Sequence, residues 1–349
     1  MAYRIYLPGL RRFNRIREIR SGIVGVLCAG FVAGPCLAQG PVIPVSQRIA
    51  AARQTASMAA DCLAVRPFYW EIGNDRIMLT GGQEGQNAPL RDTAMPIASS
   101  SKWIYAAYVA ERRKGQLTAD DIHFLTFQSG YTRFRVCLRS QTVANCMNSP
   151  LNGNGAIDPS TVDKFDYNGG HMQKHAMLMG LGDDTRLSLA ARISQTLSGA
   201  MAEPAWAIAY GQAQLAGGGN ISAAGYSVLL RALMDGRLQL GRWLGKDAVC
   251  TNPVVCPDQA VKTPVPASES WRYSIGHWVE DDPKVGDGAF SSPGAFGFYP
   301  WISADKQYYG ILARDSKGSR ASGGESQSWV QSVACGREIR AAWSTGQAR

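Results

Sequence analysis

The sequence predicts a mixed α/β fold of the α+β type, in which an antiparallel sheet flanked by helices carries a second, mostly helical lobe. Strand-type patterns occur near the start of the chain and again after residue 270, while the middle has the apolar spacing of helices. A helical pattern closes the chain. The two strand groups, although far apart in sequence, are most simply joined in one sheet. A cleft between the sheet and the helical lobe is then the expected place for a functional site.

The elements follow in this order. Residues 66–82, "RPFYWEIGNDRIMLTGG", have strand composition around a turn at Asn74-Asp75. Residues 100–114 predict a helix that ends in basic residues followed by Gly115. The expected later elements are helices within 184–197 and 222–238, strands within 271–281, 294–303 and 307–315, and a helix within 326–343.

We expect one folded domain after an export signal. The signal covers residues 1–38 and the domain 39–349, with a helical lobe at about 116–265 and a sheet lobe from about 65–115 and 266–349. The length of 349 residues suits such a domain. No fixed-period repeat is visible, which argues against a solenoid.

The N-terminal segment has the pattern of a secretory signal. Six arginines precede the short apolar stretch "GIVGVLCAGFVAG", and "PCLAQG" offers small residues at Cys36 and Ala38 for cleavage after Ala38. Periplasmic or secreted localisation without a stable membrane anchor is therefore expected, with an uncleaved anchor as the alternative. The net charge of +9 falls to +4 without residues 1–38, since 30 basic and 26 acidic residues remain. That excess is too small to predict nucleic-acid binding.

Six cysteines remain after residue 38, and an even number in an exported chain favours disulfides. Sequence alone leaves the pairing open. Short spacings favour local Cys137/Cys146 and Cys250/Cys256 bridges, in which case Cys62 and Cys335 join the two ends of the domain. None of the cysteine spacings is CxxC, so a structural zinc site is not expected.

Ser99 and Lys102 carry the first indication of chemistry. They lie three residues apart at the start of a predicted helix, in "PIASSSKW", and therefore share one face. A serine hydroxyl becomes a good nucleophile when a neighbouring base takes its proton, and burial and the helix dipole lower the pKa of a lysine. The backbone N–H of Ser99 is also free to face a developing oxyanion. Ser100 and Ser101 are expected to support this crowded turn. The alternative is a serine helix cap followed by an exposed lysine.

Four further segments extend the pattern. These are "FLTFQSGYT", "FDYNGGHMQ", "QLAGGGNISAAGYSVLLRALMDGRL" and "SSPGAFGFYPWIS". In this order the chain resembles the penicillin-recognising serine hydrolases over about residues 65–340. The resemblance is greatest to the branch of class C β-lactamases, D-aminopeptidases, esterases and 6-aminohexanoate-dimer hydrolases. It implies a β-lactamase/transpeptidase-like fold with the active site between the two lobes.

The resemblance implies roles for residues that match. Ser99 is similar to the acylated nucleophile, Lys102 to the lysine that helps to deprotonate it, and Tyr167 to the tyrosine that moves a proton to the leaving group. The third residue of that second motif is usually asparagine. Here it is Gly169, with Asn168 one place earlier as a substrate-binding candidate.

The third motif, commonly Lys-Thr-Gly or His-x-Gly, corresponds here to Ser292-Pro293-Gly294. Gly294 permits close approach of substrate, and Ala295 is expected to present the second oxyanion N–H. The sequence places Pro293 on an edge strand, since proline has no N–H. The lysine that would bind a substrate carboxylate is replaced by Ser292. Residues 262–264, Lys-Thr-Pro, lack the glycine and are rejected as this motif.

The expected function is hydrolysis of an ester or amide through an acyl-enzyme, with a small-molecule ester, amide or peptide as substrate. The alternatives are a β-lactamase or D,D-carboxypeptidase, and a non-catalytic penicillin-binding-like module. No cofactor or metal is expected. His171 and His175 have the i, i+4 spacing of metal ligands but no third ligand is evident. His171, four residues after Tyr167, is expected at the cleft. No G-x-S-x-G occurs for a Ser-His-Asp triad.

Overall fold

A computed structural model describes residues 43–316 and 325–349. The predicted export signal lies outside the described residues. The helices are α1 (Val45–Met58), α2 (Ala60–Ala64), α3 (Ser101–Arg112), α4 (Ala119–Leu125), α5 (Val143–Met147), α6 (Gly170–Ala176), α7 (Arg186–Met201), α8 (Ala223–Met234) and α9 (Glu325–Thr345). The strands are β1 (Phe68–Gly73), β2 (Met78–Glu84), β3 (Met95–Pro96), β4 (Phe165–Asp166), β5 (Ala209–Tyr210), β6 (Gly219–Ile221), β7 (Val249–Cys250), β8 (Ala260–Lys262), β9 (Arg272–Tyr273), β10 (Trp278–Glu280), β11 (Ala289–Ser291), β12 (Tyr299–Ile302) and β13 (Tyr309–Ala313).

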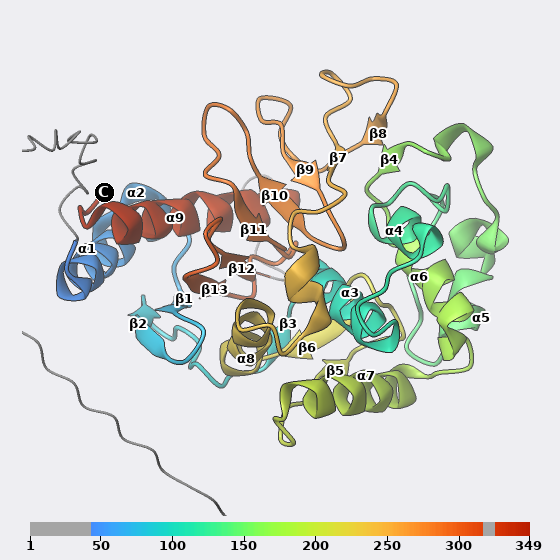
Figure 1. The fold of residues 1–349 in the computed structure, drawn as a ribbon, viewed down its shortest axis with the longest axis horizontal. Coiled ribbons are helices and arrows are strands. Elements are labelled where there is room, and N and C mark those ends of the chain that lie inside the picture. Colours follow the sequence, from blue (N-terminus) through green and yellow to red (C-terminus); the bar gives the residue numbers. More distant parts are fainter. Residues whose placement is uncertain (1–42, 317–324) are drawn as a thin grey trace, which may run out of the picture. The chain divides into compact units, whose positions relative to one another are not determined.

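The main sheet joins both ends of the domain. Among the described residues, eight strands form it in the order β2-β1-β13-β12-β11-β10-β9-β7. The pairings are antiparallel, and β1 pairs with β13 from the far end of the chain. Helices α8 and α9 both pack against β12 and β13, and Figure 1 shows these strands between the two helices. The α+β class is confirmed, and so is the prediction that the first strands and the strands after residue 270 join in one sheet.

Local sequence explains the elements near the start of the sheet. The Asn74 side chain accepts hydrogen bonds from the backbone N–H groups of Arg76 and Ile77, which closes the turn between β1 and β2. An Asn turn between two apolar segments was the predicted hairpin signal.

Helix α3 lies at the centre of the molecule. Every residue from Ser101 to Ala110 is buried, which is typical of a helix surrounded by protein on all sides. It packs against α7 of the helical part, and its first turn adjoins the small sheet of β3, β6 and β5 (Figure 1). Lys114 and Gly115 after its end both have positive φ, as the predicted glycine stop requires. A helix this deeply packed holds its first residues in fixed positions.

Three disulfides link the cysteines in the pairs that the spacing favoured: Cys62–Cys335, Cys137–Cys146 and Cys250–Cys256. The first joins α2 to α9 across a sequence separation of 273 residues. In the part of the chain that the structure describes, no helix is both long and apolar enough to cross a membrane.

Candidate active site

Ser99 lies in a short 3-10 turn, Ala98–Ser100, between β3 and α3. Ala98 has φ of +42°, a conformation that costs an alanine about 1 kcal/mol or more. Ser99 is partly exposed, whereas Ser100 and Ser101 on its C-terminal side are fully buried. The turn therefore brings one of the three serines to the surface and leaves the other two inside.

The two buried serines attach this turn to its surroundings. Ser100 Oγ donates to the backbone oxygen of Ser292 at 2.6 Å. Ser101 Oγ accepts a hydrogen bond from the backbone N–H of Gly219 in β6 at 3.0 Å. One serine thus binds the connection after β11 and the other the small sheet, and both fix the position of Ser99. The sequence expectation that they support a crowded turn agrees with these contacts.

Lys102 lies beside Ser99 in the first turn of α3. Its Nζ is 2.8 Å from Ser99 Oγ and donates to the backbone oxygen of Ala216 at 2.7 Å. The lysine is 5% exposed and forms no ion pair with any described residue. Burial lowers its pKa to about 7. At neutral pH a large fraction of the amine is therefore uncharged and can accept a proton.

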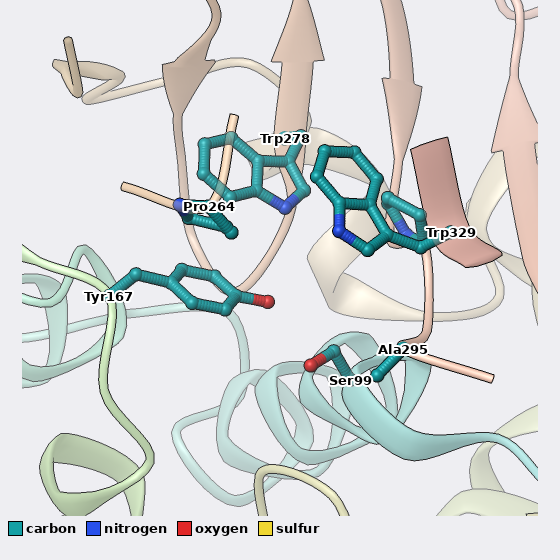
Figure 2. Close-up of a pocket in the computed structure, with 7 residues that line it drawn as sticks. Ser99, Tyr167, Pro264, Trp278, Ala295 and Trp329 are labelled. Carbon is teal, nitrogen blue, oxygen red and sulfur yellow. The ribbon is translucent and has the colours of Figure 1, made fainter. Parts of the chain in front are cut away.

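Tyr167 follows β4 and faces Ser99 from the helical side of the cleft. Its ring stacks on Trp278 with centroids 5.2 Å apart, and Lys102 Nζ lies 4.8 Å from the ring centroid. The hydroxyl is directed toward Ser99 (Figure 2) and interacts with the side chains of Ser99 and Trp278. Burial raises the pKa of Tyr167 to about 12, against the opposing effect of these interactions. The tyrosine is therefore protonated at pH 7 while much of Lys102 is not.

The third predicted segment lies against the same turn. Ser292 Oγ donates to the backbone oxygen of Ser99 at 3.2 Å. A Cβ on Gly294 would lie 2.2 Å from the backbone oxygen of Ile97, so only glycine fits there. The N–H groups of Ser99 and Ala295 have no hydrogen-bond partner among the described residues, and both residues line the pocket. They are the available donors for an oxyanion.

The position of Pro293 corrects one sequence expectation. Strand β11 ends at Ser291 and lies between β10 and β12, so it is not an edge strand. Pro293 stands in the connection that follows, where the ladder requires no N–H from it. The connection to β12, and not an exposed sheet edge, accommodates the proline.

Asn168 and His171 have other partners. The Asn168 amide donates to the backbone oxygen of Thr132 at 2.7 Å and its oxygen accepts from Gly170 N–H, although the residue borders the cleft. His171 is fully buried, with its ring nitrogens 2.7 Å from Ser129 Oγ and 3.0 Å from the backbone oxygen of Asp166. The expectation that His171 lies at the cleft is wrong. Tyr167 precedes α6, whereas His171 lies in its first turn with its side chain in the core.

Two hollows meet at Ser99. One is an apolar pocket of about 210 Å³, lined by Ser99, Tyr167, Pro264, Pro293, Ala295 and two tryptophans, Trp278 and Trp329 (Figure 2). Trp278 belongs to β10. Trp329 comes from α9, and the sequence predicted only a helix there and no pocket residue. The other hollow is polar and is lined by Lys102, amide side chains and the backbone of residues 217–219.

Comparison with known proteins finds similarity only among solved structures. No protein-family model matches the chain, and no curated protein matches it. Among solved structures, the chain is similar to a D-amino acid amidase from Ochrobactrum anthropi SV3 (TM-score 0.57, 12% identity, covering 81% of this chain and 98% of that chain). It is also similar to an octameric penicillin-binding protein homologue from Pyrococcus abyssi (TM-score 0.56, 13% identity, covering 88% and 78%). FmtA from Staphylococcus aureus matches with a TM-score of 0.52 at 12% identity, covering 80% and 86%.

These identities are low, and the similarity lies in the arrangement of helices and strands. The matched regions cover most of each chain. The chain has a β-lactamase/transpeptidase-like fold.

Proposed function

We propose that this protein is an exported serine hydrolase that cleaves an ester or amide bond through an acyl-enzyme on Ser99. The observation that carries the proposal is the 2.8 Å contact between Ser99 Oγ and the buried Nζ of Lys102, whose pKa of about 7 makes it a base at neutral pH. The predicted signal in residues 1–38 and the three disulfides support export.

In the proposed reaction, Lys102 and Tyr167 each accept one proton and give one up. The uncharged Lys102 amine takes the Ser99 proton as Oγ attacks the carbonyl carbon, and the N–H groups of Ser99 and Ala295 stabilise the oxyanion. Tyr167, protonated at pH 7, donates its proton to the leaving alcohol or amine and regains one from Lys102. The acyl group then remains on Ser99 until a water molecule, deprotonated by the same pair, releases it.

The pocket lining favours esters and amides over lactams or cell-wall peptides. The described residues that line the apolar pocket include no charged side chain, and Ser292 replaces the cation of the third motif. The lining of the apolar pocket, two tryptophans and two prolines, suits an apolar acyl or alcohol group. The penicillin-binding protein homologue among the similar structures is the reason to test the lactam alternative.

The test uses the protein that begins at Gln39 and measures its substrate turnover and its intact mass. Protein is incubated separately with p-nitrophenyl butyrate, benzylpenicillin and an alkyl fluorophosphonate, and adducts are located by peptide mapping. Ester turnover with a phosphonate adduct on Ser99 and no penicillin adduct supports the proposal. A stable penicillin adduct favours the lactam alternative. Folded protein that neither turns over nor is labelled favours the non-catalytic module.

The pH dependence gives a separate prediction. Because the base is the uncharged form of Lys102, kcat/KM for p-nitrophenyl butyrate should rise between pH 5.5 and 8.5 with an apparent pKa near 7. Tyr167, with its pKa of about 12, should cause no decline in that range. Tyr167→Phe should lower the plateau but leave the rise in place. A flat profile, or a rise that disappears in Tyr167→Phe, would remove Lys102 as the base.

A further inference from the structure

The polar hollow beside Ser99 adjoins a second hollow, and Arg135 lines both. The volumes are about 680 Å³ for the one that contains Ser99 and about 630 Å³ for the other. Phe134, Arg135 and Asn168 belong to both linings. A substrate that extends from Ser99 on this side of the cleft therefore meets Arg135 before it reaches the second hollow.

The charges along this path have one sign. Arg135, Arg133 and Lys262 line it, and the described lining residues include no carboxylate side chain. Arg135 is exposed and forms no ion pair with any described residue, whereas Arg133 pairs with Asp158 at 3.5 Å. An arginine without an ion-pair partner attracts an anionic group in a hollow whose described lining has no acid.

The backbone that carries Arg135 is fixed. The N–H groups of Arg135 and Val136 both donate to the side-chain oxygen of Asn152, at 2.7 and 3.1 Å. Asn152 is 1% exposed, and its amide donates to the backbone oxygens of Val136 and Cys146. The Cys137–Cys146 disulfide closes the same loop. Because the backbone is already fixed, only the Arg135 side chain has to be ordered when the guanidinium binds a ligand.

We propose that Arg135 binds a carboxylate of the substrate, so that the enzyme selects esters or amides with an anionic group on the polar side of the scissile bond. This inference rests on the proposed function. The guanidinium can form two parallel hydrogen bonds with a carboxylate, while Ser292 supplies no cation at the third motif. The apolar pocket lined by Trp278 and Trp329 holds the other part of the substrate. The selected anion is thus recognised from the helical side of the cleft.

Matched pairs of esters test this selection on both sides of the scissile bond. The acyl-side probes are the mono-4-nitrophenyl esters of adipic and suberic acid, each compared with its methyl 4-nitrophenyl diester. The leaving-group probe is 3-carboxyphenyl butyrate, compared with 3-(methoxycarbonyl)phenyl butyrate. Ser99→Ala supplies the background rate. At low salt we expect at least one anionic probe to exceed its neutral partner about tenfold or more in kcat/KM, with the ratio falling as salt increases.

Variants assign the selection to Arg135. Arg135→Gln should bring the anionic-to-neutral ratio to about one, Arg135→Lys should retain part of it, and Arg135→Glu should favour the neutral ester. Arg139→Gln is the control, because Arg139 is exposed on the same loop and lines neither hollow. Each variant is first compared with the parent protein by thermal unfolding, so that loss of fold is recognised.

The outcomes separate the two proposals. Ser99-dependent turnover of the neutral esters with ratios near one in every pair overturns the role of Arg135 and leaves the proposed function intact. A strong ratio that persists in Arg135→Gln overturns it as well. If the folded parent protein turns over none of the probes, the proposed function fails and this inference fails with it.

Discussion

Replacing Ser99 by alanine is expected to lower kcat/KM for p-nitrophenyl butyrate by at least about 10³-fold, because its hydroxyl is the proposed site of the acyl group. Ser99 Oγ is the atom that Lys102 and Tyr167 both contact, so its removal takes the proposed nucleophile away from the two proposed proton carriers. Stopped-flow and steady-state rates, together with the intact mass after incubation with a slow ester, measure the loss.

Ser100→Ala is the matched control for that experiment. Ser100 is buried next to the nucleophile and donates to the backbone oxygens of Ser292 and Phe298, so its loss should cost about 1–3 kcal/mol of unfolding free energy. The variant should still become acylated at Ser99. If Ser99→Ala retains more than one tenth of the parent rate while Ser100→Ala loses it, Ser99 is not the nucleophile.

Lys102→Met should change both the activity and the pH dependence of stability. It should lower kcat/KM by at least about 10²-fold, since the proton acceptor is lost. It should also change the pH dependence of stability, because a lysine whose folded pKa lies near 7 and whose unfolded pKa lies near 10.5 loses a proton on folding between those values. In that range the unfolded chain binds more protons than the folded one, so parental stability rises with pH, by up to about 1.4 kcal/mol per pH unit.

Urea unfolding with the disulfides intact measures this effect. The unfolding free energy of the parent minus that of Lys102→Met should increase by about 2 kcal/mol between pH 7 and pH 9. Lys174→Met is a suitable control, because Lys174 is partly exposed on α6 and outside both hollows at Ser99. A difference between parent and Lys102→Met that stays constant with pH would mean that Lys102 is charged in the folded protein.

The sequence predicted those features that depend on residues close together in the chain. The Asn74 turn, the glycine stop at Gly115 and the spacing of Ser99 and Lys102 each depend on a few neighbouring residues. The short cysteine spacings likewise favoured the loops that the disulfides close.

What could not be predicted depends on contacts between distant segments. Trp329 reaches the pocket because α9 packs against β12 and β13, and His171 turns inward because Ser129 and Asp166 receive its ring nitrogens. Arg135 gave no signal at all in the sequence, since an arginine in a loop is ordinarily solvated. Its position follows from Asn152, which lies 17 residues away along the chain.

The Cys62–Cys335 bridge makes the folded domain a covalent ring with short tails. A protease that cuts once in any exposed loop between these cysteines would leave the two pieces joined, so the protein would gain the mass of one water and keep its apparent size until a reductant is added. New chain ends could also be opened in such a loop without separating α2 from α9. With the export proposed above, a single proteolytic cut in such a loop would break the chain locally and leave the two pieces covalently joined.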